Sequence, residues 1–257
     1  MASNYWTEKE TMAALGLYLL LDPRRISKTN PDICALAAAI DRTGSSVALK
    51  LWNLASLDKN RTDQGKVEMK HASSLDKRIW GLYENDQETY AAVAFETLTR
   101  VMKSHKKCPV LEEFEVELCQ TPEGKERVAL VRQRVNQSYF RHSLLSNYRG
   151  ECCVTGISVP GLLVASHIKP WTACDDRTER LAANNGLLLN ALHDRAFDQG
   201  LMTVDTSYHI HISPKVNKSQ DPDGWLWSFN GSSIRLPKLQ SPSKDFLEYH
   251  NDVIFQN

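Results

Sequence analysis

The sequence predicts an α+β protein with a helical N-terminal domain over residues 1–102, a linker over 103–123 and a mixed domain over 124–257. Three observations support this division. Apolar residues recur at helical spacing as far as residue 102, whereas residues 162–212 contain short apolar runs bounded by turn residues, which is typical of strands. Between these regions the composition changes to a lysine cluster, an acidic run and two prolines, which is typical of a connecting segment.

The overall composition is that of a folded protein. The 257 residues carry 31 Lys and Arg against 31 Asp and Glu, and 42% are hydrophobic, which excludes a wholly disordered chain. The longest apolar run is shorter than the roughly 18 residues of a membrane span, and no basic leader precedes it. We therefore expect a cytoplasmic protein without membrane contact. Because no Cys-x-x-Cys pair occurs, we expect its six cysteines to be reduced thiols and not zinc ligands.

Start signals divide the N-terminal domain into short helices. Three sites have the character of a helix start: Thr7 with Glu10 (a capping box), Asn30 with Pro31, and Ser45 or Ser46. Further helices are expected around Trp80 and over residues 89–102. Each predicted helix carries apolar residues at intervals of three and four, so each can bury one face.

The first three predicted helices, joined by tight turns, resemble a helix-turn-helix module. In such modules the last helix lies in the major groove of DNA. That helix would carry Lys50, Trp52 and Asn53, so we expect Lys50 to contact DNA. The alternative is a plain three-helix bundle in which Lys50 is solvated, and the sequence leaves both interpretations open.

Residues 124–149 are strongly basic for a chain with no net charge. This segment carries six Lys or Arg residues and a single acid, and tyrosine and phenylalanine lie among the basic residues. Basic residues mixed with aromatic ones suit contact with phosphates and bases. We expect Arg132, Arg134 and Arg141 to contact nucleic acid, with a solvated amphipathic helix as the alternative.

Residues 150–212 contain the residues that suggest chemistry. Leu162–His167 is a short apolar run that ends in a histidine, and it predicts a strand that places His167 at its end. Asn184-Asn185-Gly186 predicts a turn into a second strand over Leu187–Leu189. Ala191–Gln199 is expected to be a helix that ends at Gly200. A closing hairpin is expected over residues 201–212.

This order of motifs resembles the HNH, or ββα-metal, endonucleases of the restriction type. The resemblance is carried by Cys-x-x-Thr-Gly at 152–156, Ala-Ser-His-Ile-Lys-Pro-Trp at 165–171, Asn-Gly-Leu-Leu-Leu at 185–189 and Leu-His-Asp-x-x-Phe-Asp-x-Gly-Leu at 192–201. A lead-in segment over residues 134–148 and a tail over 242–255 are also similar to such proteins. The resemblance implies that the mixed domain is a ββα-metal nuclease fold.

The resemblance also implies roles for particular residues. His167 would be the general base, because an imidazole can accept a proton from water near neutral pH. Asn185 would hold the loop between the strands, and His193 on the helix would bind a divalent metal. Lys169, two residues after the base, is expected to contact nucleic acid. The metal would neutralise charge on the scissile phosphate.

The metal ligand on the helix stays open at this point. Counted back from Phe197-Asp198, many family members place the ligand histidine where this chain has Asp194. Counted forward from Asn184, the spacing that is usual in the family places the ligand at His193. The ligand is therefore His193, Asp194 or both. A carboxylate ligand favours Mg²⁺ or Mn²⁺ over zinc.

These observations predict a metal-dependent endonuclease of double-stranded DNA, guided by its N-terminal domain. One metal site per chain suggests a homodimer, or two successive nicks, for cutting both strands. Residues 46–58 are similar to sulfur-binding domains that recognise phosphorothioate DNA, so restriction of phosphorothioated or methylated DNA is the predicted role. Two alternatives stay open: a DNA-binding regulator with an inactive nuclease domain, and an RNA nuclease.

Overall fold

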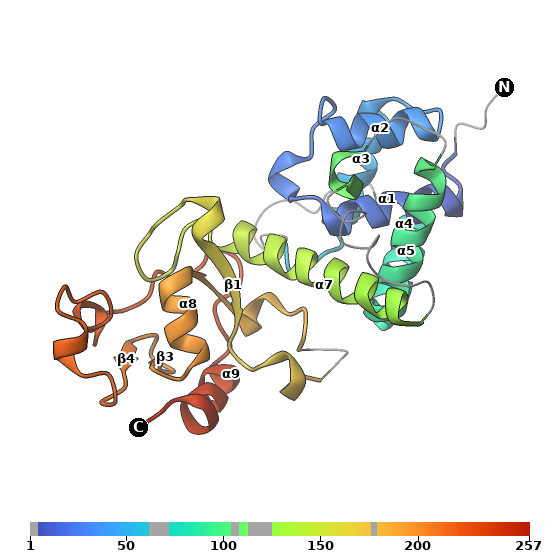
Figure 1. Cartoon of the computed structure of the whole chain (residues 1–257). Coiled ribbons are helices and arrows are strands. Elements are labelled where there is room, and N and C mark those ends of the chain that lie inside the picture. Colours follow the sequence, from blue (N-terminus) through green and yellow to red (C-terminus); the bar gives the residue numbers. More distant parts are fainter. Residues whose placement is uncertain (1–4, 62–71, 104–107, 113–124, 176–178) are drawn as a thin grey trace. The chain divides into compact units, whose positions relative to one another are not determined.

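A computed structural model describes residues 5–61, 72–103, 108–112, 125–175 and 179–257, and these form helices and two small antiparallel sheets (Figure 1). The chain divides into two compact units, residues 1–142 and 143–257. The division falls inside helix α7 (Lys125–Asn147), and not at residue 124, where we predicted the second domain to begin. Most of the predicted linker over residues 103–123 lies outside the described residues.

A buried polar network explains why the first part of α7 belongs to the N-terminal unit. The hydroxyl groups of Tyr18 and of Tyr139, which lies on α7, both donate to the buried Asp58 carboxylate, at 2.7 and 2.9 Å. The guanidinium of Arg61 lies 4.3 Å from the centre of the Tyr139 ring and donates to the Tyr139 carbonyl. These bonds are shielded from water, so breaking one would leave a buried polar group without its partner.

The N-terminal unit consists of short helices around one buried helix. Its helices are α1 (Glu8–Leu20), α2 (Pro31–Ala39), α3 (Gly44–Ala55), α4 (Ser74–Asn85) and α5 (Gln87–Met102). Helix α1 packs against α3, α4 and α5, and every residue from Thr11 to Leu20 is buried. A helix that is apolar on all sides is stable only in such a central position.

The expected caps of the first two helices are confirmed, and that of the third is corrected. Thr7 and Glu10 form the capping box of α1, and the Asn30 side chain accepts from the amides of the first turn of α2. Helix α3 is capped by Thr43, whose hydroxyl accepts from the Ser46 amide, and not by Ser45 or Ser46. Both serines lie inside the first turn of α3. The N-cap is the residue just before that turn, and its side chain accepts from the amides of the second or third helical residue.

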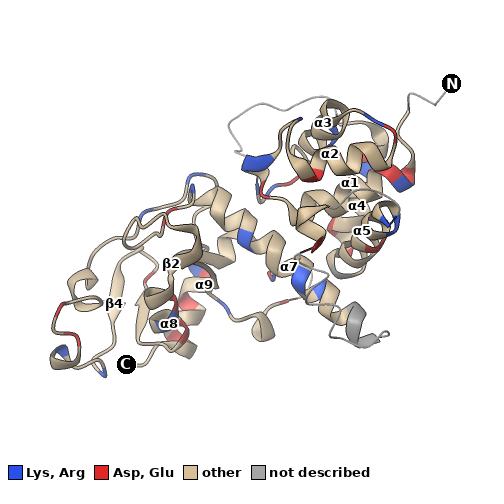
Figure 2. Cartoon of the chain, turned by 45° about the horizontal axis from the view of Figure 1, so that its top comes forward, with Lys and Arg blue, Asp and Glu red and all other residues tan. Residues whose placement is uncertain are grey.

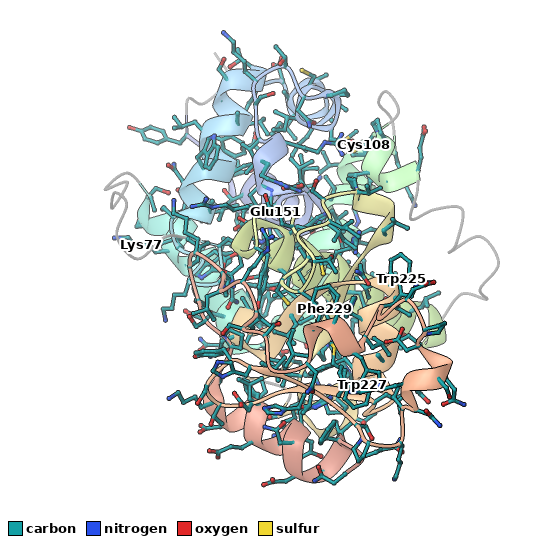
Figure 3. All side chains as sticks on the ribbon, turned by 90° about the vertical axis from the view of Figure 1, so that its left-hand side faces the viewer. Lys77, Cys108, Glu151, Trp225, Trp227 and Phe229 are labelled. Atoms are coloured by element: carbon teal, nitrogen blue, oxygen red, sulfur yellow. The ribbon has the colours of Figure 1, made fainter. Side chains whose placement is uncertain are left out.

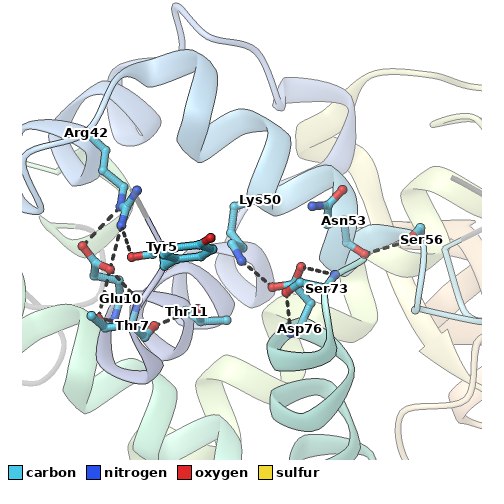
Figure 4. Close-up of polar contacts among 10 residues, drawn as sticks. All are labelled: Tyr5, Thr7, Glu10, Thr11, Arg42, Lys50, Asn53, Ser56, Ser73 and Asp76. Atoms are coloured by element: carbon cyan, nitrogen blue, oxygen red, sulfur yellow. Dashed lines mark hydrogen bonds and ion pairs between the residues drawn. The ribbon is translucent and has the colours of Figure 1, made fainter. Parts of the chain in front are cut away.

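Lys50 is buried and does not project toward solvent. It is 4% exposed, and its ammonium group forms an ion pair with the buried Asp76 carboxylate of α4 (Figure 4). The same ammonium group lies 4.7 Å from the centre of the Trp6 ring. The structure gives no support to the expected contact of Lys50 with DNA, because its ammonium group is buried and paired with a carboxylate. Leu49 and Trp52 are the residues that α3 exposes.

Lys50→Ala is expected to lower the free energy of unfolding by about 3–5 kcal/mol, because it leaves the Asp76 carboxylate buried without its cation. Urea unfolding followed by circular dichroism measures this loss. Lys59→Ala serves as the control, because Lys59 is exposed and its ion pair with Glu84 is solvated. Unchanged stability combined with weaker DNA binding would return Lys50 to a DNA-contacting role.

The second unit contains a β-hairpin followed directly by a helix. Strand β1 (Leu163–His167) pairs antiparallel with β2 (Gly186–Asn190), and His167 lies opposite Gly186. Helix α8 (Ala191–Asp198) begins at the end of β2 and packs against both strands (Figure 1). The second hairpin, β3 (Met202–Val204) with β4 (Ile210–Ile212), follows α8 and lies within the predicted residues 201–212.

The chain then returns to the hairpin and helix. Helix α9 (Lys244–Tyr249) continues into a π-helical turn over His250–Ile254. Gly200 lies just after α8 with φ at +66°, and the Gln256 amide donates to its carbonyl. A Cβ atom on Gly200 would lie 2.1 Å from the Ile254 carbonyl oxygen. The end of α8 and the π-helical turn therefore meet at a position that has room only for glycine.

Gly200→Ala is expected to lower the free energy of unfolding by about 1–3 kcal/mol, because the side chain is strained at positive φ and would displace the Ile254 carbonyl. Thermal unfolding checks this value. Gly161→Ala is the control, because a Cβ atom at Gly161 meets nothing within 4 Å. Equal effects of the two substitutions would contradict the close contact between Gly200 and the turn.

Two chain-wide expectations concern thiols and membranes. All cysteines in the described part of the chain are free thiols: Cys34, Cys108, Cys152, Cys153 and Cys174. Cys119 lies outside the described residues. None of the described helices combines the length and apolar character that crossing a membrane requires.

Candidate active site

A pocket of about 480 Å³ lies where β1, α8 and the π-helical turn meet. Its polar lining residues come from all three elements: Ser166, His167, Asp194, Arg195, Asp198, Gln199 and His250. The sequence predicted that His167 and Asp194 share a site, and the structure brings them into one pocket. Asp198 and Arg195 join them because both lie on α8 within one turn of Asp194.

His167 lies at the end of β1 with a defined ring orientation. Its Nε2 is 2.9 Å from the Arg180 carbonyl oxygen, and its ring meets Trp171 edge to face with the centroids 5.6 Å apart. Because a carbonyl only accepts, Nε2 carries the hydrogen in the neutral ring, and Nδ1 is the basic nitrogen. Burial lowers the pKa of His167 below its ordinary value, so the ring is neutral at physiological pH.

Asn185 is fully buried and joins the two ends of the loop that follows β1. Its Oδ1 accepts from the Lys169 amide at 2.9 Å, and its Nδ2 donates to the carbonyls of Lys169 and Glu179 at 3.3 and 3.2 Å. In addition, the Ile168 amide donates to the Asn185 carbonyl. The side chain thus holds the backbone on the C-terminal side of His167 in place, where the sequence predicted a loop-holding asparagine.

His193 and Asp194 lie on different sides of α8, because neighbouring helical residues are about 100° apart. His193 is 1% exposed, and its Nδ1 lies 2.9 Å from the Asn190 side-chain oxygen. Its ring packs edge to face on Phe229, which comes from the segment that also carries Trp225 and Trp227 (Figure 3). His193 does not line the pocket, whereas Asp194 does.

Asp194 and Asp198 form a carboxylate pair one helical turn apart. Burial raises the pKa of both carboxyl groups above the ordinary value. The charge of Asp194 raises the pKa of Asp198 further, because two negative groups in one pocket repel each other. Arg195 offsets part of this repulsion. A bound cation would relieve the rest, which is the electrostatic character of a metal site.

Comparison with protein families identifies this region. Residues 152–205 match the model of an HNH endonuclease family. The chain carries an HNH endonuclease domain. The matched residues include β1, β2, α8 and β3. They also contain all four motifs on which the expected resemblance to HNH endonucleases is based. No curated protein matches the chain.

His250 is a residue of the HNH pocket that the sequence did not single out. Its ring stacks on Phe197 with the centroids 3.7 Å apart, and its Nε2 donates to the Phe197 carbonyl at 3.2 Å. Its Nδ1 lies 2.8 Å from the Thr203 hydroxyl oxygen. Burial lowers the pKa of His250 to about 4, so this ring is a neutral wall of the pocket. The only signal in the sequence was the similarity of residues 242–255 to family tails.

The predicted nucleic-acid contacts are divided between the two units. Arg132, Arg134 and Arg141 lie on the part of α7 that belongs to the N-terminal unit, where Figure 2 shows basic positions along the helix. Lys169 belongs to the HNH domain, and its ammonium group lies 2.6 Å from a Glu179 carboxylate oxygen. This ion pair raises the pKa of Lys169, so the side chain stays cationic.

The donor set of the pocket fits a divalent metal held mainly by water and substrate. Within the described residues, no three His, Cys, Asp or Glu side chains come close enough together to hold an ion alone. Mg²⁺ commonly takes one or two protein carboxylates and completes its shell with water and phosphate oxygens. Asp194 and Asp198 supply two such carboxylates on one wall of the pocket.

Proposed function

We propose that the protein is a metal-dependent endonuclease that hydrolyses phosphodiester bonds of double-stranded DNA in the pocket of its HNH domain. The single observation that supports this most is the shared pocket: a neutral histidine at the end of β1 faces the same space as two carboxylates on α8. Hydrolysis needs a base that accepts a proton from water and a positive charge that neutralises the phosphate. The histidine can be the base, and the two carboxylates can bind a cation that supplies the positive charge.

In the proposed mechanism His167 accepts a proton from the attacking water at Nδ1. Its bond to the Arg180 carbonyl fixes the tautomer, and Asn185 fixes the backbone beside it. Asp194, with Asp198, would hold Mg²⁺ or Mn²⁺. When bound, the metal would offset the negative charge that develops on the phosphate and on the leaving 3′ oxygen. Arg195, on the rim of the same pocket, adds a fixed positive charge.

Cleavage is expected to stay maximal as the pH falls to that of an ordinary histidine, about 6.5, and to decline only below it. The reason is that burial lowers the pKa of His167, so the ring stays unprotonated and basic to lower pH than a solvated histidine. Single-turnover rates measured from pH 5 to 9 check this profile. A rate that is already falling at pH 7.5 would contradict the assignment of the base.

The N-terminal unit is proposed to select the DNA. A restriction enzyme directed to phosphorothioated or methylated DNA would need such a selecting unit beside its nuclease. The exposed Leu49 and Trp52 of α3 and the α7 arginines are the described residues of this unit that suit a DNA surface. Cutting both strands would then require a second copy of the chain or two successive nicks.

One cleavage assay tests the proposal. The purified protein is incubated with unmodified, cytosine-methylated and phosphorothioated plasmids, with Mg²⁺ or Mn²⁺ and with a chelator control. Metal-dependent cutting of one modified plasmid alone is the expected result. Equal cutting of all three would leave the nuclease and remove the selecting role. An RNA substrate is added to the same assay, and cutting of this RNA without cutting of any plasmid would overturn the proposed substrate.

A further inference from the structure

A second pocket of the HNH-containing unit is cationic. It encloses about 340 Å³ and lies between the end of α7 and residues 235–238. Its charged lining residues are Arg149, Arg235 and Lys238, against the single carboxylate of Glu151, which is labelled in Figure 3. Leu236 and Pro237 add an apolar wall, and Leu236 is exposed. Neither the family match nor the proposed chemistry uses this pocket.

Arg235 is exposed, and its backbone and guanidinium both contact the HNH-containing unit. The Arg235 guanidinium carbon lies 2.8 Å from where a Cβ atom on Gly156 would be, so it packs closely over that glycine. Glu151 forms an ion pair with Arg235 at 3.8 Å. The Arg235 amide donates to the Cys153 carbonyl at 2.7 Å, and the Cys153 amide donates to Leu188 in β2. Through β2, the pocket has a fixed position relative to the strand that carries His167.

The charges of the two pockets call for different ligands. The pocket with His167 contains two carboxylates and one arginine, so it repels a phosphate group until a metal is bound. The whole chain has no net charge, so its attraction for DNA has to come from local positive regions of its surface. A DNA backbone must be held by local positive charge, and three cations around a concave surface provide it.

We propose that this second pocket binds a backbone phosphate of the DNA substrate, away from the bond that is cut. Arg235 and Arg149 would contact the phosphate oxygens, and Leu236 with Pro237 would contact the adjoining deoxyribose. This assignment rests on the proposed DNA nuclease function, because it identifies the same substrate. Such a contact would position the duplex without reading its sequence.

The test measures affinity for a short DNA duplex in chelator, where no metal-dependent cleavage occurs. Arg235→Gln is expected to weaken binding about tenfold and to reduce the slope of log Kd against log salt by about one. Glu151→Gln is expected to strengthen binding, because it removes the opposing carboxylate. Opposite effects from two residues of one pocket cannot arise from misfolding. Lys218→Gln is the control, since exposed Lys218 does not line the pocket.

Three results would overturn the proposal. Equal losses for Arg235→Gln and Lys218→Gln would indicate a diffuse charge effect. Competition by submillimolar inorganic phosphate would indicate a small-anion site. The same variants are measured with an RNA duplex of equal length, and a loss of affinity for the RNA with unchanged affinity for the DNA would assign the pocket to RNA. Failure of the nuclease proposal can be distinguished from failure of this one. If the protein never cleaves DNA but Arg235→Gln weakens binding and Glu151→Gln strengthens it, the phosphate site is supported and the catalytic site is not.

Discussion

His167→Ala is expected to lower the rate of DNA cleavage by about 10²–10⁴-fold, because it removes the group that accepts the proton of the attacking water. DNA affinity and the unfolding temperature should change little. The alanine variant also loses the bond to the Arg180 carbonyl. His167→Gln is therefore a second variant, since its amide can donate to that carbonyl but cannot act as a base. Both variants should be equally slow in single-turnover assays.

The matched control is His209→Ala. His209 lies in the same unit, outside the pocket, and it pairs with Asp205 in the β3–β4 hairpin. This variant should cleave at the wild-type rate. If His167→Gln retained most of the activity, the base would have to be another group and the proposed role of His167 would be lost.

Asp194→Asn is expected to reduce Mg²⁺-dependent cleavage by about 10²-fold or more, because it removes a charged ligand from the proposed metal site. Manganese affinity, measured by electron paramagnetic resonance without DNA, should fall in parallel. Asp198→Asn should show the same direction of change, since the two carboxylates share the pocket. The resonance measurement separates a loss of metal binding from a loss of chemistry.

The control for this prediction is the neighbouring residue. His193→Gln keeps a side-chain donor near the Asn190 oxygen and leaves the pocket unchanged, so manganese affinity should be retained. Some loss of stability is expected, because His193 packs on Phe229 in the interior. Manganese affinity lost in His193→Gln and kept in Asp194→Asn would make His193 the ligand.

The sequence was sufficient wherever local signals determined the structure. The capping box at Thr7 and Glu10 placed the start of α1. The apolar run ending at His167 and the turn at Asn185-Gly186 placed the hairpin, because strand ends and turns depend on neighbouring residues. The helix that follows begins where β2 ends, so the proximity of His167 to α8 could also be predicted.

Long-range pairing is what the sequence could not supply. Lys50 was expected on the surface, but its partner Asp76 lies 26 residues away on another helix, and no spacing rule connects them. The choice between His193 and Asp194 depended on the rotation of α8 against the hairpin, which packing sets. His250 and Arg235 come from segments remote in sequence, so their pockets became visible only in the folded chain.

The wall that His250 and Ile254 form has a consequence for synthesis of the protein. The chain leaves the ribosome N-terminus first, so His167, Asn185 and Asp194 emerge well before the π-helical turn. Until residues 250–256 emerge, the pocket lacks one side and the end of α8 lacks its contact at Gly200. Nascent chains in which the base and the carboxylates have emerged, but residues 250–256 have not, are therefore expected to be inactive.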